Sequence, residues 1–123
     1  MKVLARTLIL LGSLILSAMF CIDAASAQDA SVKSATKLPQ AAGGAPGASI
    51  SCNILTNNSL QVQGSNTSNK TYQCDVTCNM KIPSGAPVVF NCTPSLPAHT
   101  TNGDLCDSSG PFSEVTSGKY TCK

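Results

Sequence analysis

The chain contains one histidine, His99, and histidine is the most frequent general base in catalysis. Serines are plentiful and Asp104 follows shortly after, so the residue types of a Ser-His-acid triad are present. The Gly-x-Ser-x-Gly pattern that marks many serine nucleophiles does not occur. His99 also lies between Pro97 and the Asn102-Gly103 pair, in a segment typical of an exposed loop. We therefore interpret His99 as a loop residue and expect a protein without enzymatic activity.

Cys74 and Cys78 are separated by three residues, a spacing that suggests two kinds of cysteine chemistry. A redox centre has two intervening residues, and positions four apart on a strand lie about 13 Å apart, too far for a disulfide. A zinc site would need these thiols on a helix with two further ligands, whereas the thiols of exported proteins are usually oxidised. We expect neither a metal nor any other cofactor.

Asn102, Asp104 and Asp107 place several oxygen atoms in a short segment, as calcium loops do. No acidic residue falls at the twelfth position that a calcium loop requires, and Cys106 interrupts the pattern. We interpret these three residues as solvated turn residues.

Residues 1–27 have the features of a secretory signal peptide. Lys2 and Arg6 form a positive start, an apolar run follows, and Ala25 and Ala27 are the small residues that a signal peptidase requires. The run is shorter than the ~20 residues that a transmembrane helix needs. We place cleavage after Ala27, which predicts a secreted or periplasmic protein with no stable membrane anchor.

Removal of residues 1–27 leaves six lysines and five acidic residues, a net charge of +1. Such a chain has no basic surface that could neutralise a phosphate backbone, and few aromatic side chains that could stack on bases. We expect no nucleic-acid partner. The absence of tryptophan also argues against a carbohydrate site built on aromatic stacking.

Residues 28–48 are rich in alanine, glycine and serine and contain two sizeable apolar side chains, Val32 and Leu38. Such a segment buries too little surface to offset about 1 to 2 kcal/mol of backbone entropy per residue. We predict a disordered leader here and a single folded domain over residues 49–123.

Alternation of apolar and polar residues predicts an all-β domain, a small antiparallel sandwich or sheet. The clearest strand covers residues 72–80, and further strands are expected near residues 50–54, 60–62, 88–92, 112–116 and 119–122. Residues 64–70 and 94–103 read as polar loops. A three-residue turn would place Ile54 opposite Val62, and a hairpin centred on Gly85 would place Cys78 opposite Cys92.

Six cysteines remain after signal cleavage, and an even number in a small exported domain predicts three disulfides. The expected hairpin makes Cys78–Cys92 the first choice, because opposed Cβ atoms lie close to the span of a disulfide. Cys106–Cys122 would close a C-terminal lobe, which leaves Cys52 with Cys74.

Two hypotheses of function follow. The first is an exported, monomeric, non-enzymatic interaction or structural module that contacts an unknown protein or envelope component through residues 94–107. The second is a secreted hydrolase inhibitor or effector that presents the same loop. The candidate contact residues are Ser95, Leu96, Pro97, His99, Asn102 and Asp104.

Overall fold

A computed structural model describes residues 31–123, which contain eight β-strands and no helix. The expected signal peptide, its cleavage after Ala27 and the first three leader residues lie outside the described residues. Within residues 31–123, no helix has the length and apolar character that crossing a membrane requires.

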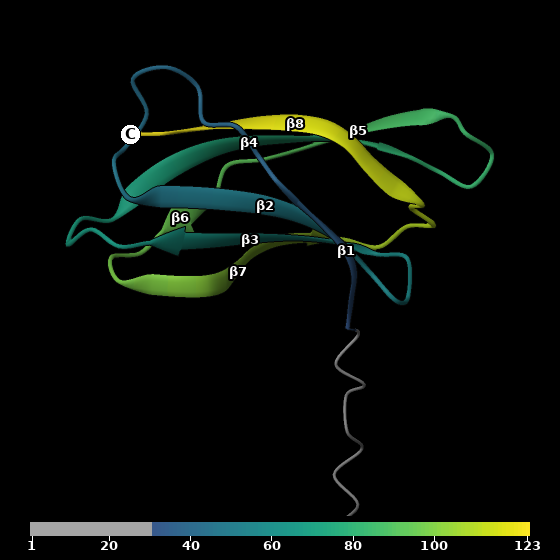
Figure 1. Ribbon diagram of the computed structural model, residues 1–123, viewed down its shortest axis with the longest axis horizontal. Helices are drawn as coiled ribbons and strands as arrows, with labels where there is room; N and C mark the ends of the chain where they lie inside the picture. Colours follow the sequence, from purple (N-terminus) through teal and green to yellow (C-terminus); the bar gives the residue numbers. More distant parts are fainter. Residues whose placement is uncertain (1–30) are drawn as a thin grey trace, which may run out of the picture.

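The strands form two facing antiparallel sheets (Figure 1), which confirms the all-β fold class. One sheet has the strand order β1-β2-β3-β7. Its strands are β1 (Val32–Lys37), β2 (Ala48–Leu55), β3 (Leu60–Asn66) and β7 (Thr100–Ser108). In the other sheet, β4 pairs with β8 and with β5 and β6. These strands are β4 (Tyr72–Lys81), β5 (Pro87–Cys92), β6 (Ser95–Leu96) and β8 (Glu114–Cys122).

The core lies between the sheets because apolar residues alternate along the central strands. On β4, Tyr72, Cys74, Val76, Cys78 and Met80 are buried, while the residues between them face outward. The inner positions of β2 and β3 follow the same alternation and contribute Ile50, Cys52, Ile54, Leu60 and Val62.

All six described cysteines form disulfides, but the expected pairing is wrong. Cys52–Cys78 joins the two sheets, Cys74–Cys122 joins neighbouring strands of one sheet, and Cys92–Cys106 joins β5 to β7. None of the pairs Cys78–Cys92, Cys106–Cys122 and Cys52–Cys74 is formed. Three disulfides are consistent with an oxidising extracellular or periplasmic location.

The hairpin between β4 and β5 explains why the first-choice pair is wrong. Its loop is Pro83-Ser84-Gly85, closed by hydrogen bonds from Gly85 N to Ile82 O and from Ile82 N to Ala86 O. Gly85 has a φ of 87°, so this is a turn whose last residue is left-handed. The loop is therefore centred one residue earlier than expected.

This register places Cys78 opposite Phe90 and Cys92 opposite Val76. Cys78 therefore has no cysteine opposite it on β5, and it meets Cys52 of the facing sheet instead.

The β2–β3 hairpin is shifted in the same way. Asn58, with a φ of 61°, is the left-handed last residue of the loop, and Leu55 N donates to Ser59 O. As a result Ile54 lies opposite Leu60, and not opposite Val62 as expected.

The predicted leader is ordered from residue 31 onward, which corrects the boundary at residue 49. Strand β1 pairs with β2, and the buried Leu38 and Ala45 belong to the core. The chain then lies along β8, where Ala41 N donates to Tyr120 O and Ala45 N to Cys122 O. Backbone pairing and a few well-placed apolar side chains therefore order a segment whose composition suggested disorder.

Candidate functional site

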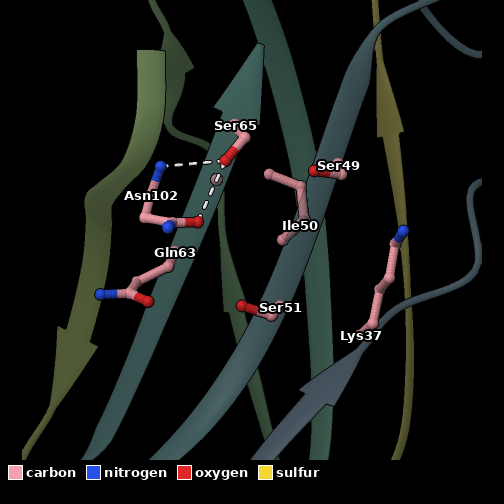
Figure 2. Close-up of a pocket in the computed structure, with 8 residues that line it drawn as sticks. Lys37, Ser49, Ile50, Ser51, Gln63, Ser65 and Asn102 are labelled. Carbon is pink, nitrogen blue, oxygen red and sulfur yellow. Dashed lines mark hydrogen bonds between the residues drawn. The ribbon is translucent and has the colours of Figure 1, made fainter.

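A pocket with a volume of about 200 Å³ lies on the outer face of the β1-β2-β3-β7 sheet (Figure 2). Its lining comes from all four strands and is mainly polar: Lys37, Ser49, Ile50, Ser51, Gln63, Gly64, Ser65 and Asn102. The pocket is therefore a property of the sheet face, and not of a loop.

Strand register explains why these side chains meet. Residues at odd positions of β2 and β3 point outward, because their even-numbered neighbours fill the core. Lys37 is opposite Ser51, Ser51 is opposite Gln63, and Gln63 is opposite Asp104. These pairs form one row that crosses the whole sheet, with a cation on one edge strand and a carboxylate on the other.

The floor of the pocket is formed by serines, whose short side chains leave a depression in the sheet face. Ser49 lies opposite Ser65, and Ser51 occupies the next outward position on β2. The longer side chains of Lys37 and Gln63 stand on either side, and Figure 2 shows Lys37 extending alongside β2 in the direction of Ser49. Small hydroxyl-bearing residues between longer polar ones produce a hollow that is open to solvent.

Gln63 is held by two hydrogen bonds. Its Oε1 accepts from Asn53 Nδ2 at 3.0 Å, and its Nε2 donates to Asp104 Oδ1 at 3.0 Å. Both ends of the amide are engaged, so Gln63 is a fixed wall of the pocket. The same contact holds the Asp104 carboxylate close to the pocket.

Asn102 is positioned by Ser65. Its backbone nitrogen donates to Ser65 Oγ at 2.9 Å, and Ser65 Oγ donates to Asn102 Oδ1 at 3.2 Å. Asn102 has a φ of 47°, a left-handed conformation that asparagine adopts more readily than most residues. This irregular point of β7 turns the Asn102 side chain over the edge of the pocket.

The segment that we expected to be a partner loop is mostly strand. Ser95 and Leu96 form β6 and pair with Gln73 and Tyr72, and Leu96 is fully buried. Leu96 is therefore a core residue and cannot be a contact residue. The polar run from Thr100 onward resembled a loop, but it is the edge strand β7, whose outer face is in water.

The remaining four candidate contact residues lie in two places, the turn between β6 and β7 and the region of the pocket. Pro97 and His99 lie at the exposed corner between β6 and β7, where Pro97 O accepts from Asn66 Nδ2 and His99 N donates to Ser68 O. Asn102 lines the pocket, and Asp104 lies next to it, where its carboxylate accepts a hydrogen bond from Gln63. Of the six expected contact residues, one therefore lines the pocket and a second contacts its wall.

Sequence reasoning missed the other lining residues, although a signal for most of them was present. Ser49 and Ser51 are the polar partners in the same alternation that identified the core, and Gln63 continues the alternation of residues 60–62. Ser65 lies in residues 64–70, which were interpreted as a loop, whereas β3 extends to Asn66. Lys37 could not be found in this way, because it lies in the segment predicted to be disordered.

Within residues 31–123, no group of three histidine, cysteine or acidic side chains is placed to hold a metal ion. Comparisons of this chain with protein-family models, with curated proteins and with solved structures find no match.

Proposed function

We propose that this protein is an exported, non-enzymatic binding module and that the polar outer face of the β1-β2-β3-β7 sheet is its contact surface. The observation that supports this most directly is the pocket itself, a hollow on a rigid sheet lined by hydroxyl, amide and ammonium groups. A sheet cross-linked by disulfides holds such groups in fixed positions, which lowers the entropic cost of binding.

The proposed contact surface is the face of a sheet, and not a loop formed by residues 94–107. The face still includes Asn102 and Asp104, but their partners are now residues of β1, β2 and β3. The inhibitor hypothesis depends on an exposed Ser95–Ala98 segment, and the buried Leu96 side chain leaves it without its central contact residue.

The test uses purified protein and a defined set of isolated envelope and matrix components. These are peptidoglycan, lipopolysaccharide, acidic polysaccharides, and vesicles of the membrane from which the envelope components are isolated. Binding of each component is measured by biolayer interferometry for the unmodified protein and for Ser51→Trp, which fills the pocket. Thr121→Trp is the matched control, because Thr121 is a half-buried outward residue of the other sheet.

We expect at least one component to bind, to be lost with Ser51→Trp and to be retained with Thr121→Trp. Circular dichroism and the Tm verify that both variants are folded. Binding that survives Ser51→Trp places the contact surface elsewhere, and a complete absence of binding contradicts the binding-module function.

A further inference from the structure

The polar atoms of the pocket divide into those already hydrogen-bonded and those left over. Gln63 uses both ends of its amide, Ser65 Oγ both donates and accepts, and Asn102 Oδ1 accepts. Among residues 31–123, no hydrogen bond engages Lys37 Nζ, the Ser49 and Ser51 hydroxyls or Asn102 Nδ2. The groups left over are thus donors, two of which, the hydroxyls, can also accept.

The charge distribution across the pocket is uneven. Within the described part of the chain, Lys37 forms no ion pair; the ion pair that is present, Lys81 to Glu114 at 3.0 Å, lies on the other sheet. The Asp104 carboxylate is at the opposite end of the row, bound by Gln63. Three strand spacings of about 4.8 Å separate the backbones of Lys37 and Asp104 by about 14 Å, and the side chains between them form the pocket.

A ligand that matches this arrangement carries an anionic, acceptor-rich group at the Lys37 end and hydroxyl donors toward the Asp104 end. A carboxylate fits the first requirement, because a lysine ammonium and two hydroxyls can share its two oxygens through charge-assisted hydrogen bonds. A ring or chain that bears several hydroxyls fits the second requirement.

Neutral sugars fit less well. Tyr72, Phe112 and Tyr120 are buried, so they offer this face no aromatic platform for stacking. Binding therefore depends on charge and directed hydrogen bonds, and these favour an acidic sugar over its neutral counterpart.

We propose that this pocket binds the carboxylate of a sugar acid, with Lys37, Ser49 and Ser51 on the carboxylate and Asn102 and Asp104 toward the hydroxyls. The inference rests on the proposed function and specifies its ligand class. The same chemistry occurs in a free monosaccharide acid and in an acidic residue of a polysaccharide.

The test is a titration of the ¹⁵N-labelled protein followed by NMR. The probes are sodium galacturonate and galactose, which differ in the carboxylate, and a galacturonate trimer. We expect galacturonate to shift the amides of residues 49–51, 63–65 and 102, and galactose to bind at least tenfold more weakly. A trimer that binds more tightly than the monomer identifies a polysaccharide as the source, and equal affinity identifies the free sugar acid.

Lys37→Gln removes the charge from an exposed side chain and should weaken galacturonate binding roughly tenfold or more. Lys119→Gln is the matched control, an exposed lysine on the outer face of the other sheet, and should leave the affinity unchanged. Binding to unmodified protein should also weaken as sodium chloride is raised.

Equal affinity for galactose and galacturonate, shifts that map away from the pocket, or a Lys37→Gln variant that binds normally would each overturn the inference. The absence of any shift with all three probes overturns it as well. None of these results affects the Ser51→Trp comparison, so the proposed function fails only if that comparison fails.

Discussion

Cys92 on β5 and Cys106 on β7 form a disulfide that links an edge strand of one sheet to an edge strand of the other, with their Cα atoms 6.7 Å apart. Both cysteines are half-buried. The other two disulfides, Cys52–Cys78 and Cys74–Cys122, lie fully within the core. The three bonds therefore differ in their access to a reductant.

We predict that mild reduction of the native protein opens Cys92–Cys106 first, because thiol attack requires access to a sulfur atom. Alkylation and peptide mass spectrometry should find label on Cys92 and Cys106 while the other four cysteines remain oxidised. The reduced protein should stay folded but lose about 3 kcal/mol of unfolding free energy, as expected for a loop of this length. Label appearing first on Cys74 or Cys122 would contradict this order.

The two buried asparagines should respond differently to substitution. Asn66 Nδ2 donates to three backbone carbonyls, of which Lys70 O is the nearest at 2.7 Å, whereas the buried Asn53 Oδ1 has no partner within the described residues. Asn66→Leu should cost about 3 kcal/mol or more, because it leaves several buried groups unpaired. Asn53→Leu removes an unsatisfied acceptor together with one hydrogen bond, from Asn53 Nδ2 to Gln63 Oε1. Gln63 is only partly buried, so its freed oxygen can bind water and the change should stay within about 1 kcal/mol.

Urea unfolding of both asparagine variants measures the difference, and the similar size of asparagine and leucine makes them a matched pair. A larger loss for Asn53→Leu than for Asn66→Leu would refute the assignment of these hydrogen bonds.

Gly85→Ala should destabilise the protein through its backbone alone. Gly85 has a φ of 87°, and a Cβ added there would meet no atom within 4 Å. The left-handed conformation of a residue with a side chain costs roughly 1 to 2 kcal/mol. Asn58→Gly, at the equivalent turn position of the other hairpin, should be nearly neutral. Thermal unfolding of the two variants provides the comparison.

Leu38→Ala tests whether residues 31–48 belong to the folded domain. Leu38 is 4% exposed and packs over Gly118, where a Cβ would lie 2.7 Å from Leu38 Cδ2. Truncation of a buried leucine should cost about 2 to 5 kcal/mol. Val32→Ala, at a residue of β1 that is 46% exposed, should cost far less. If Leu38→Ala leaves chemical denaturation unchanged, this segment behaves as the leader that its composition suggested.

Tyr120 should make stability fall at alkaline pH. Burial raises the pKa of its hydroxyl above the ordinary value of 10.0, and the hydroxyl donates to Ala48 O at 2.8 Å. Because the folded pKa exceeds the unfolded one, the stabilisation is complete below pH 10.0 and is lost as the pH rises through the folded pKa. Tyr120→Phe should reduce this dependence, and unfolding measured between pH 8 and pH 12 tests it.

Local alternation was sufficient to predict the all-β class and the inward face of β4, because a period of two depends on neighbouring residues alone. Alternation was insufficient to predict the register in which the strands pair. In both hairpins a left-handed residue, Asn58 or Gly85, ends a three-residue loop, and placing the loop one residue too late moved every opposed pair by two positions. The disulfide pairing failed for that reason, and also because it depends on contacts between the sheets that alternation does not encode.

The candidate site, like the fold, could be predicted from the sequence only in part. Ser51 and Gln63 were recognisable as outward positions, but their meeting with Lys37 and Asp104 depends on the order of the strands in the sheet. Leu96 was misassigned because a two-residue strand is too short to show a period.

The arrangement around β8 has a consequence for the biogenesis of the protein. β8 pairs with β4 and also lies against the segment that precedes β2, through Tyr120 and Cys122. It is the last of the described strands in chain order, so during synthesis from the N-terminus β4 lacks this neighbour until residue 122 has emerged. Cys52 and Cys78 are both available earlier, whereas Cys74 waits for Cys122. Until Cys122 is available, Cys74 can therefore form a non-native disulfide with another cysteine. A disulfide isomerase is the class of catalyst that would correct such a pairing.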